Sequence, residues 1–166
     1  MNNYIDRPHQ KMPMTSEGYT ALREELAHRI QVERPRIAAR LRDAIADDPN
    51  LPENAEYQAA KSEQEVNEAR VSELQNKLAR AEVIDVSELS GDTVTFGATV
   101  TVVDEDTNDQ RQWRIVGEPE ADARRGKISV SSPLARALIG KTTNATVEVL
   151  TPNGTKAYKI SKVDWR

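Results

Sequence analysis

Residues 53–81 read ENAEYQAAKSEQEVNEARVSELQNKLARA. Small and apolar side chains recur in this stretch in alternating steps of three and four positions, which is the heptad pattern of a coiled-coil helix. Such a stripe must be buried against another helix, and its polar members Gln64 and Asn67 favour one register at a cost in stability. The stripe comprises Tyr57, Ala60, Gln64, Asn67, Val71, Leu74, Leu78 and Ala81.

The stretch before it, residues 16–45, has the same helical spacing. Thr15 or Ser16 is suited to be the N-cap, because its side-chain oxygen can accept a free amide of the first turn. Pro35 lies inside the pattern and predicts a kink, because proline removes a helical donor and clashes with the preceding turn. The apolar positions are Tyr19, Leu22, Leu26, Ile30, Ile37, Leu41, Ala44 and Ile45.

Residues 46–52 read ADDPNLP and separate the two predicted helices. Two prolines and an asparagine break a helix and turn the chain. A short turn between two long heptad helices predicts an antiparallel hairpin. At about 1.5 Å of rise per residue, about 30 residues in each helix extend roughly 45 Å.

Beyond residues 83–84 the pattern changes to short runs rich in β-branched residues, with turn signals between them. A short helix fits residues 134–139, because Gly140 is a natural residue to follow a helix C-terminus. We therefore predict an α+β protein, with residues 1–13 as a disordered tail, 14–85 as a coiled-coil hairpin and 90–166 as a small antiparallel β domain. The expected strands are 94–96, 98–103, 111–116, 127–130, 146–150 and 157–163.

Composition excludes several classes of function. The net charge of -4 argues against an independent DNA-binding protein, because binding to a duplex needs a basic face. The chain has no cysteine, which removes disulfides, thiol nucleophiles and thiolate zinc sites, and His9 and His28 show no ligand spacing. The apolar runs are far short of the roughly 18 residues of a membrane span, and residues 1–13 do not resemble a signal peptide. We expect a cytoplasmic protein with no membrane partner.

Motifs along the whole chain match one known family. In the first half they are MTSEGY (14–19), EEL (24–26), ERP (33–35) and ENAEY (53–57). In the second half they are AEVID (81–85), FGATV (96–100), RIVG (114–117), ISVSSP (128–133) and ALIGK (137–141). In this order they resemble the bacterial transcript cleavage factors of the GreA/GreB family, and the GreA branch more closely than the GreB branch.

The resemblance implies a coiled-coil N-terminal domain and a C-terminal domain of FKBP-like fold. It implies that the C-terminal domain grips the rim of the secondary channel of bacterial RNA polymerase, while the hairpin enters the channel. Acidic residues at the hairpin tip then help to hold a second Mg²⁺, shared with the polymerase, which hydrolyses its own transcript at the backtracked RNA 3′ end. The resemblance also implies an accessory factor that is not itself an enzyme, needs no cofactor in isolation and contacts DNA weakly or indirectly.

Four residues of the turn are candidates for this chemistry: Asp47, Asp48, Asn50 and Glu53. Glu53 matches a tip acid of the family, whereas Asn50 stands where the family usually has an aspartate. The loop is also longer than the family pattern, so Asp48 is the alternative to Asn50. Because Mg²⁺ prefers oxygen ligands and an amide supplies no charge, Glu53 and Asp48 are the expected metal ligands. Helix-dipole stabilisation is the alternative explanation for Glu53.

Two further groups are candidates for binding. Arg36 and Arg40 are four positions apart and share a helix face, where the resemblance implies contact with emerging RNA; a solvated face balanced by acidic residues is the alternative. Ser132 is expected to cap the short helix, with Pro133 at its first position. By resemblance, Ser131, Ser132 and Pro133 also contact the polymerase.

The altered tip leaves a second function open, that of a non-cleaving regulator that binds in the polymerase channel and inhibits transcription. A prolyl isomerase or peptide-binding module is suggested only by fold analogy, which does not determine function. Aromatic residues make up only 4% of the chain, which is too few to line an apolar peptide pocket. A cleavage assay on backtracked polymerase distinguishes the first two functions.

Overall fold

The computed structural model describes residues 10–165, so His9 and most of the predicted tail lie outside the described residues. The chain forms two compact units. Tyr19–Arg80 forms one of them, and residues 10–18 together with residues 81–165 form the other. The second unit is therefore built from two separate parts of the sequence.

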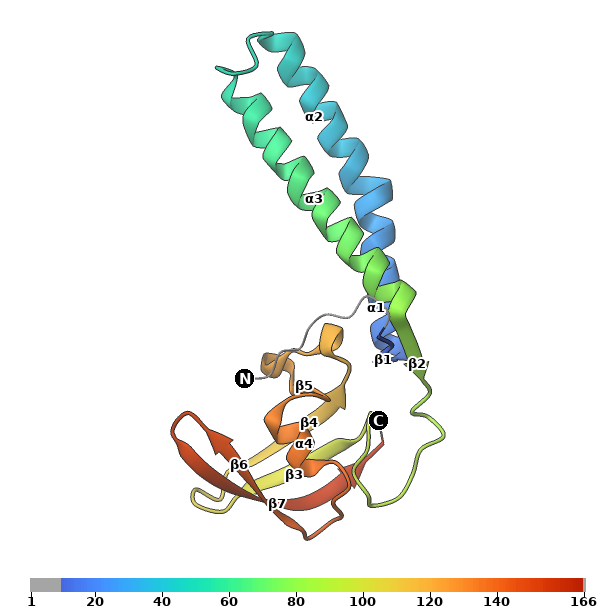
Figure 1. The fold of residues 1–166 in the computed structure, drawn as a ribbon, viewed down its shortest axis with the longest axis vertical. Coiled ribbons are helices and arrows are strands. Elements are labelled where there is room, and N and C mark those ends of the chain that lie inside the picture. Colours follow the sequence, from blue (N-terminus) through green and yellow to red (C-terminus); the bar gives the residue numbers. More distant parts are fainter. Residues whose placement is uncertain (1–9, 166) are drawn as a thin grey trace. The chain divides into compact units, whose positions relative to one another are not determined.

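The first unit is the predicted helical hairpin. Its first arm consists of α1 (Ser16–His28), a π-helical segment (Arg29–Glu33) and α2 (Arg34–Asp47), and its second arm is α3 (Ala55–Arg80). Figure 1 shows α2 and α3 running side by side, joined at one end by the turn that was predicted from the two prolines. The α+β class and the antiparallel hairpin are thus confirmed.

A single apolar stripe holds the two arms together. On α3 the predicted positions Ala60, Asn67, Val71 and Leu74 are buried. On the first arm the buried side chains are Leu22, Ile37 and Ala44. Ile45, which was predicted to lie in the same stripe, is 44% exposed. Adjacent side chains point about 100° apart around a helix, and here Ala44 is buried while Ile45 lies outside the stripe.

A kink was predicted at Pro35, and the structure has a π-helical segment directly before the helix α2 that contains this proline. Pro35 cannot donate to the carbonyl of Gln31, and its ring would clash with that carbonyl in a regular α-helix. In the π-helical segment the Arg34 amide instead donates to the carbonyl of Arg29, which widens the turn before the proline. Helical structure is therefore continuous from Ser16 to Asp47, through α1, the π-helical segment and α2.

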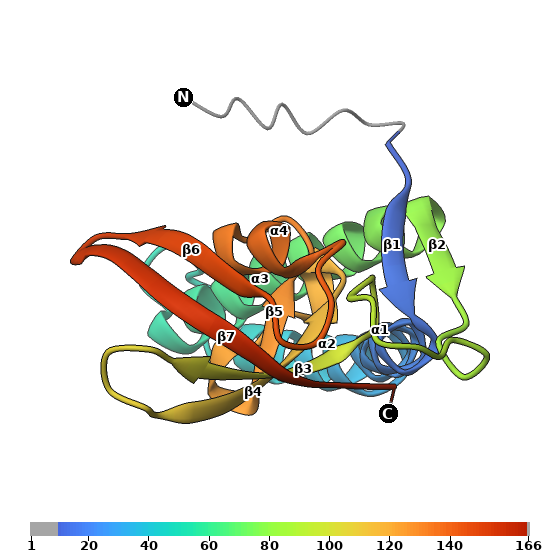
Figure 2. The same ribbon diagram turned by 90° about the horizontal axis from the view of Figure 1, so that it is seen from below.

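A pair of short parallel strands lies at the edge of the predicted tail. β1 (Met12–Thr15) pairs with β2 (Ala81–Ile84), with Met12 opposite Ala81 and Thr15 opposite Ile84. Figure 2 shows the two strands side by side. The prediction of a disordered tail up to residue 13 is therefore wrong for Met12 and Pro13, because their backbone finds hydrogen-bond partners that follow the hairpin in the sequence.

The rest of the second unit is a five-stranded sheet in the order β5-β4-β3-β7-β6. Its strands are β3 (Thr99–Asp104), β4 (Gln110–Val116), β5 (Lys127–Ser129), β6 (Thr146–Thr151) and β7 (Gly154–Asp164). All pairs are antiparallel except β4 with β5, so the sheet is mixed rather than purely antiparallel. The parallel pair arises because two 3₁₀ turns, Glu118–Glu120 and Ala123–Arg125, carry the chain back between the two strands.

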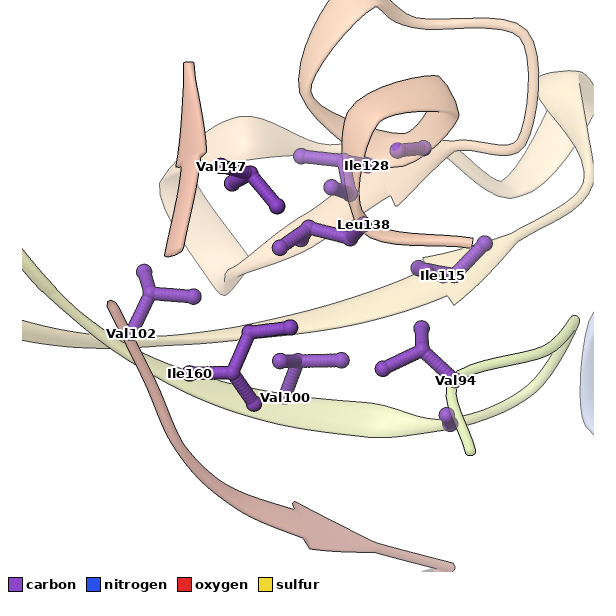
Figure 3. Packing of buried hydrophobic residues seen from close by; sticks show 10 residues of the cluster. Val94, Val100, Val102, Ile115, Ile128, Leu138, Val147 and Ile160 are labelled. Carbon is purple, nitrogen blue, oxygen red and sulfur yellow. The ribbon is translucent and has the colours of Figure 1, made fainter. Parts of the chain in front are cut away.

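The core of this unit lies between the sheet and the short helix α4 (Pro133–Leu138). Figure 3 shows Leu138 of α4 among Val100, Ile115 and Ile160 of the sheet. Residues 94–96 were predicted to be a strand, which is wrong: they form no strand, and the isolated bridge to Thr142 is made by Thr93, the residue before them. The fully buried Val94 still contributes to the core, so its apolar character reflects burial rather than strand formation.

A carboxylate joins the N-terminal strand to the sheet part of the same unit. Glu120 accepts hydrogen bonds from the amide of Thr15 at 3.0 Å, from the hydroxyl of Thr15, and from the amide of Gly117 at 2.9 Å. Thr15 also accepts the Gly18 amide at 3.1 Å, so it is the N-cap of α1. A Cβ at Gly18 would clash with the Glu120 carboxylate, and one at Gly117 would clash with the carbonyl of Pro13.

No helix among residues 10–165 is long and apolar enough to cross a membrane.

Candidate functional site

The four candidate residues of the tip lie together on the turn that joins α2 to α3. Asp47 is the last residue of α2, and Asp48, Asn50 and Glu53 lie in the connection that ends at Asn54. All four candidate side chains are exposed. The turn therefore presents three carboxylates and one amide to solvent at the end of the hairpin.

The turn has a defined backbone. The amide of Asn50 donates to Oδ1 of Asp48 at 2.9 Å, and the amide of Glu53 donates to the carbonyl of Asn50 at 3.0 Å. Gln58 of α3 donates its side-chain amide to the carbonyl of Leu51 at 3.0 Å. The two prolines thus frame a connection that is closed by local hydrogen bonds, not a loose loop.

Asn54 is the buried residue beneath the turn, with 6% of its surface exposed. Its Nδ2 donates to the carbonyls of Ala44 and Asp48, both at 2.8 Å, and its Oδ1 accepts the amide of Tyr57 at 2.9 Å. The last of these bonds makes Asn54 the N-cap of α3.

The donor set of the tip fits a shared metal ion but not a closed metal site. Within residues 10–165 there is no group of three or more histidine, cysteine, aspartate or glutamate side chains placed to hold a metal. One oxygen of Asp48 is already bonded to the Asn50 amide. Asp48 and Glu53 can therefore add one or two carboxylate oxygens to an ion whose other ligands come from elsewhere, which is a common arrangement for Mg²⁺.

Arg36 and Arg40, the predicted RNA-binding residues, both form ion pairs across the hairpin. Arg36 contacts Glu33 at 2.6 Å and also Glu63. Arg40 contacts Glu56 at 2.5 Å and Glu63 at 2.6 Å. The structure thus brings the two arginines together on one face, as predicted, but it places them in a balanced set of charges and not in a free basic patch.

These ion pairs keep the acidic partners charged. The hydrogen bond from Arg36, followed by that from Arg40, holds the pKa of Glu63 below its usual value. The hydrogen bond from Arg40 likewise lowers the pKa of Glu56. All four side chains are partly exposed, so solvent screens each pair and its contribution to stability is small.

The predicted docking residues form the start of α4. Ser132 accepts the amide of Ala135 on its hydroxyl at 3.3 Å, and Pro133 is the first residue of the helix, which confirms the predicted cap. The hydroxyls of Ser129 and Ser131 lie 2.8 Å apart. Pro133 is exposed, and Ser131 and Ser132 are half-buried. This loop therefore has both a structural role and an accessible surface.

Two residues of the site, Asn54 and Glu63, were not predicted from the sequence. Asn54 has a local signal, because an asparagine directly before a helix is a recognised N-cap. Glu63 gave no signal of its own, because a glutamate on a heptad helix is expected on any solvated face. Its two contacts with arginines of the other arm depend on the register of the hairpin.

Comparisons with known proteins agree with this architecture. Residues 12–83 match the family model "Transcription elongation factor, N-terminal", and residues 89–164 match "Transcription elongation factor, GreA/GreB, C-term". The chain is 60% identical over 157 residues to transcription elongation factor GreA of Rhodopseudomonas palustris (strain TIE-1), with 95% of this chain and 99% of the relative covered.

Two further relatives illustrate the range of similarity. The factor GreA of Bradyrhizobium sp. (strain BTAi1 / ATCC BAA-1182) is 59% identical, with 95% of this chain and 99% of that protein covered. A crystal structure of GreA factor homolog 1 (Gfh1) of Thermus thermophilus is 24% identical with a TM-score of 0.43, and the match covers 93% of this chain and 99% of that one. From the two family models and the two close relatives, it follows that the chain belongs to the GreA/GreB family of transcription elongation factors.

Proposed function

We propose that the protein is a transcription elongation factor that binds bacterial RNA polymerase at its secondary channel and stimulates cleavage of the backtracked transcript. The observation that carries the proposal is the tip: Asp47, Asp48 and Glu53 are exposed together on a closed turn at the end of a long hairpin. The chain itself is an accessory factor, and the polymerase performs the hydrolysis.

The proposed role of the tip follows from the electrostatics of phosphodiester hydrolysis. A second Mg²⁺ in such a reaction neutralises developing charge and activates the attacking water. Glu53 and Asp48 contribute negative oxygens on the side of the polymerase active centre that the hairpin reaches. Asp48 offers the oxygen that is not bonded to Asn50, and Asp47 adds negative charge next to it.

The other candidate residues belong to binding. Ser131, Ser132 and Pro133 are proposed to contact the rim of the channel, supported by the accessible start of α4. Arg36 and Arg40 are proposed to meet the emerging RNA 3′ segment, where a phosphate would exchange for one of their present carboxylate partners. A cytoplasmic location, without membrane contact and with at most weak or indirect contact to DNA, is part of the same proposal.

A non-cleaving regulator that occupies the channel is the second candidate function. It is favoured by one observation: an amide, Asn50, occupies the turn where the family usually has an acid, and one oxygen of the replacement candidate Asp48 is committed to the turn itself. With less charge at the tip, the hairpin would occupy the channel without completing the metal site.

The decisive experiment measures RNA cleavage in backtracked polymerase complexes over a range of Mg²⁺ concentrations. We expect the wild-type chain to stimulate cleavage and Glu53→Gln to reduce the maximal rate about 10-fold or more, a loss of at least roughly 1.4 kcal/mol of transition-state stabilisation. Binding to polymerase should not change, and added Mg²⁺ should restore part of the rate. Glu65→Gln, which removes the same charge from an exposed position of α3, is the matched control and should behave as wild type.

Two further variants separate the two functions. Asp48→Asn should reduce cleavage as Glu53→Gln does if Asp48 has taken the role of the missing acid, and Asn50→Asp should then have little effect. A large gain of cleavage in Asn50→Asp would instead assign the site to Asn50. Slower elongation with no cleavage by the wild-type chain at any Mg²⁺ concentration would refute the cleavage proposal and support the regulator.

A further inference from the structure

The strongest unassigned feature is the buried side chain of Asn54, which connects three parts of the hairpin tip. Its amide nitrogen bonds the last turn of α2 through the carbonyl of Ala44 and the start of the connection through the carbonyl of Asp48. Its oxygen bonds the first turn of α3 through the amide of Tyr57. One side chain therefore ties the end of one arm, the turn and the beginning of the other arm together.

The chemistry of this position requires an asparagine. Two carbonyl oxygens need two donors, and one amide hydrogen needs an acceptor, which together match the hydrogen-bonding capacity of a carboxamide. The opposite orientation of the amide would place its oxygen against two carbonyl oxygens. An aspartate has the same shape but no donor, and a serine retains the cap but cannot reach both carbonyls.

The consequence falls on Asp48. Its amide donates to the carbonyl of Ala44 at 3.1 Å, its carbonyl accepts from Asn54, and its Oδ1 accepts from Asn50. The backbone of this residue is thus bonded at both its amide and its carbonyl, and one oxygen of its carboxylate is bonded to the amide of Asn50. A fixed backbone limits the directions that the exposed carboxylate can take, and preorganisation of this kind decides how well a charged group stabilises a transition state.

We propose that Asn54 is a positioning residue for cleavage: it holds the turn so that the Asp48 and Glu53 carboxylates reach the shared metal ion in one arrangement. This inference rests on the proposed function and assigns no direct contact between Asn54 and metal or RNA. According to this proposal, the hydrogen bonds of Asn54 hold the acidic turn in one conformation, so the tip is not a flexible loop that carries acids.

Asn54→Asp is the sharpest variant, because it keeps the size of the side chain and the cap to Tyr57 while it places an oxygen against the carbonyls of Ala44 and Asp48. Asn67→Asp is the matched control. It makes the same change at another buried asparagine of α3, with 4% of its surface exposed, where the partners are the side chain and carbonyl of Arg29. Asn54→Ser, which preserves only the cap, provides a second test should the aspartate variant lose helical content.

Amide hydrogen exchange tests the structural step without reference to activity. The amides of Asp48 and Glu53 should exchange about 10-fold faster or more in Asn54→Asp than in the wild type, while Asn67→Asp leaves them unchanged, because loss of the local bonds permits local opening. Unchanged exchange in both Asn54 variants would overturn the proposal. This measurement remains decisive even if the wild-type chain proves not to stimulate cleavage.

Cleavage kinetics test the functional step. In Asn54→Asp the maximal rate should fall about 10-fold or more and the Mg²⁺ concentration for half-maximal rate should rise, while the factor concentration for half-saturation of polymerase stays the same. In Asn67→Asp all three quantities should equal those of the wild type. A weaker half-saturation with an unchanged maximal rate, or an equal loss of rate in Asn67→Asp, would show that the hairpin as a whole was damaged and would overturn the positioning role.

Discussion

The helical hairpin and the five-stranded sheet are stabilised by different interactions. The sheet and α4 enclose a core of fully buried aliphatic side chains, among them Val100, Ile115, Leu138 and Ile160. The hairpin has one narrow buried stripe, and ion pairs between partly exposed side chains also connect its two arms. Apolar packing therefore decides the stability of the sheet unit, whereas charged side chains modulate the stability of the hairpin.

The largest effect is expected in the core of the sheet. Ile160→Ala should lower the free energy of unfolding of the sheet unit by about 3 kcal/mol, because it removes buried methyl groups and leaves a cavity beside α4. Denaturant unfolding followed by tryptophan fluorescence reports on this unit, because Trp113 and Trp165 both pack against its core. The helical circular dichroism signal of the hairpin should keep its midpoint.

Leu150→Ala is the control for this prediction, because Leu150 lies on the same sheet and is 79% exposed. It should leave the fluorescence midpoint unchanged. A parallel loss of the helical signal in Ile160→Ala would show that the two units unfold as one and would break the comparison.

A smaller effect is expected where β1 joins the sheet part of its unit. Glu120→Ala removes the acceptor for the amide and hydroxyl of Thr15 and for the amide of Gly117, which should cost about 2 kcal/mol. Amide exchange at Thr15 and Gly117 should accelerate accordingly. Glu118→Ala changes an exposed acid in the same 3₁₀ turn, and it should leave both amides protected.

The hairpin should respond to pH through Glu25. Hydrogen bonds from Arg70 lower the pKa of Glu25 from 4.5 to about 2, against the opposing effect of its partial burial. A carboxylate whose pKa is lowered on folding stabilises the fold above its unfolded pKa and loses that contribution as the pH falls toward the folded value. Helical circular dichroism should therefore show hairpin stability decreasing from about pH 4.5 toward pH 2.

Glu25→Gln removes this contribution. It should lower hairpin stability by about 1 kcal/mol at neutral pH, once the partial exposure of the pair is allowed for, and it should flatten the acid dependence. Glu24→Gln, at the exposed neighbouring position, should retain the wild-type profile. An unchanged acid profile in Glu25→Gln would mean that other carboxylates control the hairpin.

The smallest effect is expected for the pair of Arg34 and Glu68. Arg34 bonds both oxygens of Glu68 at 2.8 Å, yet both side chains are more than 40% exposed. Exposed pairs are screened by solvent and salt, so Glu68→Gln should leave the thermal midpoint of the helical signal unchanged. A clear destabilisation would show that ion pairs, and not the apolar stripe, determine the strength of the hairpin.

The hairpin could be predicted from the sequence because its heptad pattern continues over many residues and its turn signals are local. The stripe through Ala60, Val71 and Leu74 needed only heptad spacing to be placed, and the turn needed only its prolines. The cap at Ser132 and the C-terminal glycine of α4 were predictable for the same reason. Each of these features depends on residues that are neighbours along the chain.

Features that depend on distant partners were not predictable in the same way. The strand at Met12 is stabilised by residues after the hairpin, and the parallel direction of β5 depends on the path of two 3₁₀ turns. At the tip, spacing and resemblance predicted the acids as site residues but not the support beneath them, because Asn54 reaches the carbonyl of Ala44 only when both arms are in register. The pairing of Arg36 and Arg40 with Glu63 was hidden for the same reason.

The parallel pairing of β1 with β2 also has a consequence for how the chain folds. Met12 pairs with Ala81, so the chain between them must form a closed loop before the two strands can pair. Closing a loop costs entropy that grows with the length of the loop. Formation of the hairpin brings the two ends together beforehand, so the helices should form first and the strand pair last. A fragment that starts at residue 90 would lack both strands and would expose the Glu120 carboxylate without its partner Thr15, whereas a chain in which a short linker replaces Tyr19–Arg80 should assemble the whole unit without waiting for a hairpin.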